Sequence, residues 1–99
     1  MDNNTMIVGN PEEKEIAEWI INYFPDEPLK LVRMTDAYVT IKRNDWDIVR
    51  LKYTDRAKWL MFPSIEAKQK KHYLEDKFEV ENYVAAMHDS IEHAKRYDF

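Results

Sequence analysis

The sequence predicts an α+β domain of two layers, in which a four-stranded antiparallel meander packs against an N-terminal helix and a long C-terminal helix. Near both ends of the chain, apolar side chains recur at spacings of three and four residues, which is typical of helices with one buried face. Over residues 29–62 the spacing changes to two, which is typical of strands. We find no linker and no internal repeat, so the 99 residues are predicted to form a single domain.

Residues 1–9 are predicted to form either a flexible arm or a short strand, because they contain one short apolar triplet among polar residues. The first helix is predicted to begin after Asn10, a residue type common at N-caps, with Pro11 in its first turn. Pro25 and Pro28 end this helix. Its apolar stripe is predicted to consist of Ile16, Ala17, Ile20, Ile21, Tyr23 and Phe24.

Four strands are predicted over residues 29–34, 38–43, 46–53 and 58–62, where β-branched and aromatic residues are enriched. The breaks between them are short and rich in residue types that tolerate turns. Short connections indicate antiparallel neighbours, because a parallel pair needs a crossover of about a dozen residues.

After the strands, Ser64 is predicted to cap a short helix that runs through Lys71. The long C-terminal helix is predicted to begin at Asp76, because Asp76 and Glu79 have the spacing of a helix N-terminus. One apolar face continues over about four turns through Val80, Tyr83, Val84, Met87, Ile91 and Ala94.

Alternation along the strands predicts which side chains face the helices. The core face is predicted to hold Val39, Ile41, Val49, Leu51 and Tyr53. The opposite face is predicted to hold Tyr38, Thr40, Lys42, Trp46, Ile48, Arg50 and Lys52. The last strand has large apolar residues at consecutive positions, which predicts that it is covered on both sides.

The composition excludes several classes of site. The chain has no cysteine, which excludes disulfides, cysteine-ligated metals and thiol nucleophiles. It has one glycine, Gly9, whereas a P-loop and a dinucleotide fingerprint each need several. The longest apolar run, Tyr83 to Met87, is far too short to cross a membrane. We therefore expect a cytoplasmic protein that has no cofactor and does not bind membranes.

Charge is distributed unevenly along the chain, although the net charge is only −4. Residues 1–27 carry seven acidic and one basic side chain, and residues 73–99 carry seven acidic and three basic ones. Residues 28–72 carry eleven basic and five acidic side chains. In a two-layer fold this pattern predicts acidic helices on one side of the molecule and a basic sheet on the other.

The acidic helices are the first candidate for a functional surface. They would make the protein a non-enzymatic interaction module that binds a larger protein with a basic surface, by imitating the phosphates of a nucleic acid. The alternative is that these residues are ordinary solvent-facing helix positions that suit the helix dipole. The candidate residues are Glu12, Glu13, Glu15, Glu18, Glu79, Glu81, Asp89 and Glu92.

The basic sheet is the second candidate, because cationic side chains bind phosphates while aromatic rings stack on unpaired bases. This face would bind single-stranded nucleic acid weakly. The alternative is that it is an ordinary solvated sheet face. A pI of about 5.3 argues against nucleic-acid binding, as do Asp45, Asp47 and Asp55. The candidate residues are Tyr38, Lys42, Trp46, Arg50, Lys52, Arg56 and Lys58, with Trp59 beside them.

Catalytic and metal sites find little support in the sequence. His88 with Glu92, and Asp89 with His93, have a spacing of four residues that suits metal ligands, but each pair offers only two. No nucleophile, base and stabilising group come together in any known motif. We predict that the protein is not an enzyme and holds no metal, with a metal-assisted hydrolase as the third alternative.

The segment from Ile48 to Leu60 reads IVRLKYTDRAKWL and resembles a strand–turn–strand segment of small uncharacterised bacterial proteins of phage and mobile-element type. The resemblance implies a role such as inhibition of a host nucleic-acid-handling or defence protein, and it implies no site residue. The protein is predicted to be a monomer, or a homodimer that pairs through an uncovered edge strand.

Overall fold

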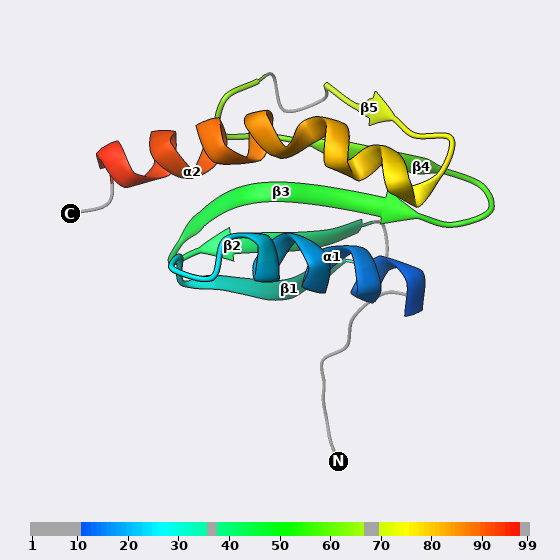
Figure 1. Cartoon of the computed structure of the whole chain (residues 1–99), viewed down its shortest axis with the longest axis horizontal. Helices are drawn as coiled ribbons and strands as arrows, with labels where there is room; N and C mark the ends of the chain where they lie inside the picture. Colours follow the sequence, from blue (N-terminus) through cyan, green and yellow to red (C-terminus); the bar gives the residue numbers. More distant parts are fainter. Residues whose placement is uncertain (1–10, 36–37, 67–69, 98–99) are drawn as a thin grey trace, which may run out of the picture.

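The computed structural model describes residues 11–35, 38–66 and 70–97 (Figure 1). The arm predicted for residues 1–9 lies outside these residues. In chain order the elements are α1 (Pro11–Tyr23), β1 (Leu29–Thr35), β2 (Tyr38–Arg43), β3 (Trp46–Tyr53), β4 (Lys58–Met61), β5 (His72–Tyr73), the 3-10 helix η2 (Lys77–Tyr83) and α2 (Val84–Tyr97).

The strands form one antiparallel sheet in the order β1-β2-β3-β4-β5, so every strand pairs with its neighbour in the sequence. The predicted α+β class, the antiparallel sheet and the two helices are confirmed. The predicted number of four strands is wrong, because β5 adds a fifth at the edge, where Trp59 pairs with Tyr73 and Leu60 with His72. Two residues are too few for a period-two pattern to be recognised.

The helix predicted from Ser64 to Lys71 is also wrong within the described residues. Residues 63–66 form a turn, and residues 70–71 are in no helix. Ser64 does not act as a cap, because its hydroxyl donates a hydrogen bond to the carbonyl oxygen of Asp47, at 2.7 Å. This hydrogen bond holds the turn that follows β4 against β3.

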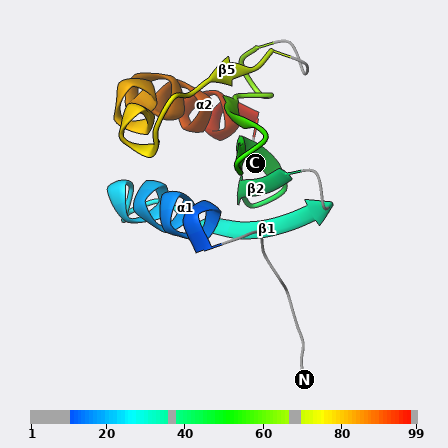
Figure 2. The ribbon, with the colours of Figure 1, turned by 90° about the vertical axis from the view of Figure 1, so that its right-hand side faces the viewer.

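Both helices lie on the same face of the sheet, which gives two layers (Figure 2). α1 contacts β1, β2 and β3, while α2 contacts β3. The core between the layers contains the predicted core face of the strands and most of the predicted apolar stripes of both helices. The prediction that Tyr23 belongs to the buried stripe is wrong, because its side chain is 52% exposed. Its fully buried large side chains include Ile20, Ile41, Leu51, Leu60, Phe62, Met87 and Ile91.

The C-terminal helix begins where the sequence predicts, since the Asp76 carboxylate accepts a hydrogen bond from the backbone N–H of Phe78 at 2.8 Å. Its first seven residues form the 3-10 helix η2, and the α-helix starts only at Val84. The prediction of one continuous α-helix is therefore wrong for this part. Apolar spacing alone does not separate the two, because residues i and i+3 share a side in both.

A bulge in β3 changes the faces of two side chains. Ile41 pairs with Val49, but Lys42 pairs with Asp47, so Ile48 is an extra residue without a partner in the ladder. Ile48 and Val49 are consequently both 0% exposed in the core. Beyond the bulge, Trp46 packs against the core as well. The prediction that Ile48 and Trp46 lie on the open face of the sheet is wrong for this reason.

Candidate docking surface

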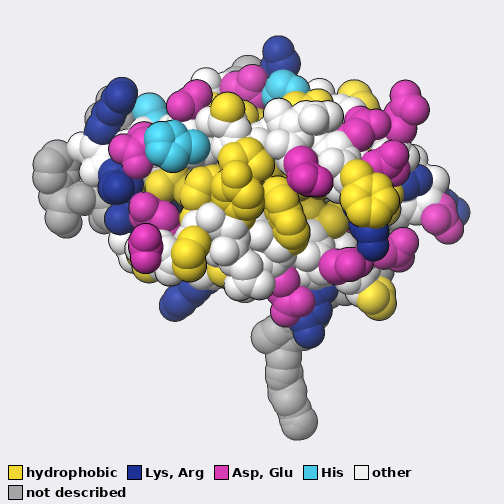
Figure 3. Space-filling model, in the orientation of Figure 1, with side chains coloured by type: hydrophobic (Ala, Val, Ile, Leu, Met, Phe, Trp, Pro, Cys, Tyr) yellow, Lys and Arg dark blue, Asp and Glu magenta, His cyan; other side chains and the backbone are white. Residues whose placement is uncertain are grey.

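The outer face of the helix layer consists of the exposed sides of α1, η2 and α2, and it carries most of the predicted acidic residues. Figure 3 shows acidic side chains around a band of apolar side chains that runs between the helices. Among the candidates, Glu12, Glu15, Glu18, Glu81 and Asp89 are exposed, and Glu79 and Glu92 are half-buried. Seven of the eight predicted acidic residues thus reach the surface.

Glu13 is the exception, and its prediction as a partner-binding residue is wrong. It is 5% exposed, and its Oε2 accepts a hydrogen bond from the backbone N–H of Tyr53 at 3.0 Å. The position explains this contact, because Glu13 lies three and four residues before Ile16 and Ala17 on the buried stripe of α1. Glu13 therefore joins the first turn of α1 to the end of β3 rather than facing a partner.

Ion pairs neutralise part of the acidic charge at two places. Lys77 at the start of η2 donates to Glu15 of α1 at 2.8 Å, and this hydrogen bond raises the pKa of the Lys77 ammonium. At the other end of the layer, Glu27 accepts hydrogen bonds from Arg43 at 3.0 Å and from Lys95 at 3.5 Å. The Arg43 hydrogen bond is the main reason that the pKa of Glu27 is lowered, and Lys95 adds to it.

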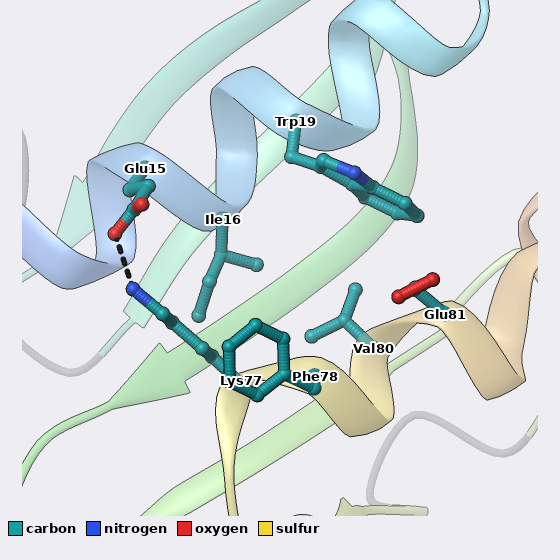
Figure 4. Close-up of a pocket in the computed structure, with 7 residues that line it drawn as sticks. All are labelled: Glu15, Ile16, Trp19, Lys77, Phe78, Val80 and Glu81. Atoms are coloured by element: carbon teal, nitrogen blue, oxygen red, sulfur yellow. Dashed lines mark hydrogen bonds and ion pairs between the residues drawn. The ribbon is translucent and has the colours of Figure 1, made fainter.

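A pocket of about 190 Å³ lies between α1 and η2 in this layer (Figure 4). Apolar side chains form most of its lining, with Glu15, Lys77 and Glu81 at its rim; its apolar residues are Ile16, Trp19, Phe78 and Val80. Phe78 is 71% exposed, and the Trp19 ring lies 5.2 Å from the ring of Tyr23, another exposed aromatic side chain. This is the place where the acidic layer offers accessible apolar surface.

The sequence did not point to this pocket, although it contained a signal. Ile16 belongs to the predicted stripe of α1, and Trp19 lies one turn further along the helix, outside that stripe. Phe78 lies outside the apolar face that Val80 begins, and its side chain is 71% exposed. Trp19 and Phe78 line one pocket only because the two helices lie side by side on the sheet.

The open face of the sheet, opposite the helices, brings together four of the seven residues predicted for nucleic-acid binding: Tyr38, Lys42, Arg50 and Lys52. The register adds residues that sequence reasoning missed: Lys30, which pairs with Lys42, and Tyr73, which pairs with Trp59. Lys71 joins them, with its Nζ 4.9 Å from the centre of the Trp59 ring. The open face is therefore basic and contains aromatic rings.

The other three residues predicted for this face lie elsewhere, which corrects the prediction of one continuous face. Trp46 points to the core side because of the bulge. Lys58 pairs with the core residue Tyr53, and its Nζ lies 5.4 Å from the centre of that ring, so it belongs to the helix-facing side. Arg56 is exposed in the turn between β3 and β4.

Comparison of the chain with protein-family models, with curated proteins and with solved structures gives no match in any of the three. Function is therefore inferred from the geometry of the two faces. The resemblance of residues 48–60 to proteins of phage and mobile-element type stays a prediction.

The remaining candidates are weaker within the described part of the chain. His88 lies 4.0 Å from both Asp89 and Glu92, but no three histidine or acidic side chains are grouped so that they could hold a metal ion among residues 11–35, 38–66 and 70–97. In the same residues, no helix has the length and apolar character needed to span a bilayer.

Proposed function

We propose that this protein is a non-enzymatic interaction module that docks the outer face of its helix layer on a basic surface of a larger protein. The observation that carries the proposal is the pocket between α1 and η2, where the exposed Phe78 and the half-buried Trp19 lie within an acidic surface. Accessible apolar surface rimmed by polar side chains is typical of protein interaction sites. Exposed acidic side chains alone would not distinguish this layer from an ordinary helix surface.

The charge of the two faces supports docking in one orientation. A basic surface is attracted by Glu12, Glu18 and Glu81 on the helix layer. The same surface is repelled by Lys30 and Lys52 on the open face. Electrostatic complementarity of this kind raises association rates and disfavours wrong orientations.

A nucleic-acid-handling or defence protein is the class of partner that we propose. Such proteins carry basic surfaces that bind phosphates. Carboxylates spaced along two neighbouring helices can occupy the positions of phosphates on that surface. The resemblance of residues 48–60 to phage and mobile-element proteins agrees with this class of partner.

Site-specific photo-crosslinking in native cells tests the proposal. Benzoylphenylalanine replaces Glu81 on the helix layer in one variant and Lys52 on the open face in the matched control. We expect the variant at position 81 to crosslink to one basic protein, and this crosslink to disappear when Glu12→Lys, Glu18→Lys and Asp89→Lys are combined. Crosslinks to protein from position 52 alone would contradict the proposal.

A second candidate function is single-stranded nucleic-acid binding by the open face. It is favoured by the alignment of Lys30, Lys42 and Arg50 near Tyr73, which is 70% exposed. Two observations weaken it: Trp59 is only 5% exposed beneath Lys71, and Asp47 pairs with both Lys42 and Arg50. Fewer aromatic rings are therefore available to stack on bases, and fewer cations to bind phosphates, than the sequence suggests.

Anisotropy of a fluorescent single-stranded oligonucleotide tests this second function. If the open face binds the oligonucleotide, the association constant falls steeply as the salt concentration is raised. Lys52→Ala should then make the plot of log K against log salt concentration less steep, by about 0.7 in slope. Affinity that does not change with salt would exclude this function.

A further inference from the structure

We infer that the pocket between α1 and η2 receives one bulky apolar side chain of a basic amphipathic segment of the partner. The inference rests on the proposed function and names the chemistry of the docked segment. It is independent of which protein carries that segment.

The size of the pocket matches a single large side chain. Its volume is about 190 Å³, and a protein cavity of about 150 Å³ is large enough to bind benzene. The pocket therefore has room for one aromatic ring or one branched aliphatic group. Phe78, which lines it, is 71% exposed, so a side chain can enter the pocket from outside.

The lining selects an apolar group. Ile16 and Val80 are buried at its base, and Trp19 and Phe78 form its walls, as Figure 4 shows. The charged atoms of Glu15 and Lys77 are already joined to each other at 2.8 Å. A polar side chain would lose hydrogen bonds to water in such a pocket, whereas an apolar one gains free energy by leaving water.

The acidic residues at the rim of the pocket favour a docked segment that carries basic side chains close to its apolar one. Glu81 lies at the pocket and forms no ion pair with another described residue. On α1, Glu12 and Glu18 are exposed one turn before and one turn after Glu15. A helical segment with Lys or Arg three or four residues from its apolar anchor would place cations beside these carboxylates.

A second copy of this chain fits the pocket less well. A symmetric dimer across this surface would bring the rim of one copy against the same rim of the other. The acidic side chains at positions 12, 18 and 81 would then face like charges. Charge complementarity therefore favours a basic partner over self-association.

The test uses the whole chain and a fluorescein-labelled 15-residue amphipathic peptide, with lysines on its polar face and a single phenylalanine on the other. We expect replacement of that phenylalanine by alanine to weaken binding about tenfold, as loss of one buried apolar side chain does. Phe78→Ala and Glu81→Lys are expected to weaken binding at least about threefold, because each removes one part of the site.

Matched controls separate the pocket from general effects. Tyr73→Ala removes an equally exposed aromatic side chain from the opposite face, and Glu75→Lys makes the same charge change outside the pocket. We expect both controls to bind the peptide within about twofold of the native chain. In NMR spectra, the indole signal of Trp19 is expected to shift on binding, whereas those of Trp46 and Trp59 stay in place.

Three outcomes would overturn the inference. Peptide binding that is insensitive to the peptide phenylalanine and to Phe78→Ala would mean that docking is purely electrostatic; the proposed function would stand if the crosslink from position 81 persists. Light scattering that shows a dimer lost with Phe78→Ala would assign the pocket to a second copy. Binding that depends on the open face, with no crosslink from position 81, would contradict the inference and the proposed function together.

Discussion

The open face of the sheet and the helix layer carry opposite charge, and they also differ in how their aromatic side chains are covered. On the open face of the sheet, cations cover two of the three aromatic rings: Lys71 lies over Trp59, and Arg50 lies over Tyr38 at 5.2 Å, while Tyr73 is 70% exposed. On the helix layer, Phe78 and Tyr23 are exposed beside a pocket with an apolar base. Charge alone therefore does not distinguish the two faces, because the exposed rings of the helix layer lie beside an apolar pocket whereas Tyr73 does not.

The largest effect on stability is expected at Ile48, the extra residue of the bulge in β3, which is buried in the core. Ile48→Ala should lower the free energy of unfolding by about 2–5 kcal/mol, because it removes buried methyl groups from the core. Lys52→Ala, on the open face of the same strand, should change it by less than about 0.5 kcal/mol. Urea unfolding measures both, and equal small effects would mean that Ile48 faces solvent.

The buried carboxylate of the helix layer should give the next largest effect. Glu13→Ala removes the buried carboxylate that accepts the hydrogen bond from the N–H of Tyr53, so we expect a loss of about 1–3 kcal/mol in unfolding free energy. Hydrogen exchange at the Tyr53 amide should become faster. Glu12→Ala, one residue earlier and exposed, serves as the control and should lie within about 0.5 kcal/mol of the native chain.

Glu27 connects the two layers, and its contribution should depend on pH. Its folded pKa is lowered below 4.5 chiefly by the hydrogen bond from Arg43, so its stabilisation is present above 4.5 and is lost as pH falls through the folded pKa. We expect Glu27→Gln to cost about 1 kcal/mol near pH 6 and much less near pH 3. Urea unfolding at a series of pH values measures this difference, and a constant difference would contradict it.

The smallest effect is expected on the open face, where Lys71 covers Trp59. Lys71→Ala should cost about 0.5 kcal/mol, the contribution of an exposed cation–π contact. In a background with Trp19→Phe and Trp46→Phe, acrylamide should then quench Trp59 fluorescence more strongly. Lys70→Ala is the control, and equal quenching in the two variants would show that Lys71 does not shield the ring.

Sequence reasoning predicted the elements that repeat a pattern over many residues. The stripe through Ile16 and Ile20, and the alternation from Val39 to Ile41, each depend on local geometry that propensity and periodicity capture. Trp46 was assigned to the wrong face because a single extra residue in β3 reverses the alternation. No local pattern indicates such a bulge.

The candidate site was predictable in its charge but not in its shape. Glu15 and Glu81 follow from the acidic composition of the helices. The pocket between them is lined by Trp19 and Phe78, which belong to helices at opposite ends of the chain. That these two residues line one pocket depends on how both helices pack on the sheet, which sequence spacing does not specify.

The sequential order of the five strands has a kinetic consequence. Each strand finds its partner in the preceding or following segment, so the sheet closes only short loops as it assembles. The bond between Glu13 and Tyr53 spans 40 residues, so it forms only once the third strand is in place. We therefore expect the strands to pair rapidly, and the anchoring of the first helix to be a late event on the folding pathway.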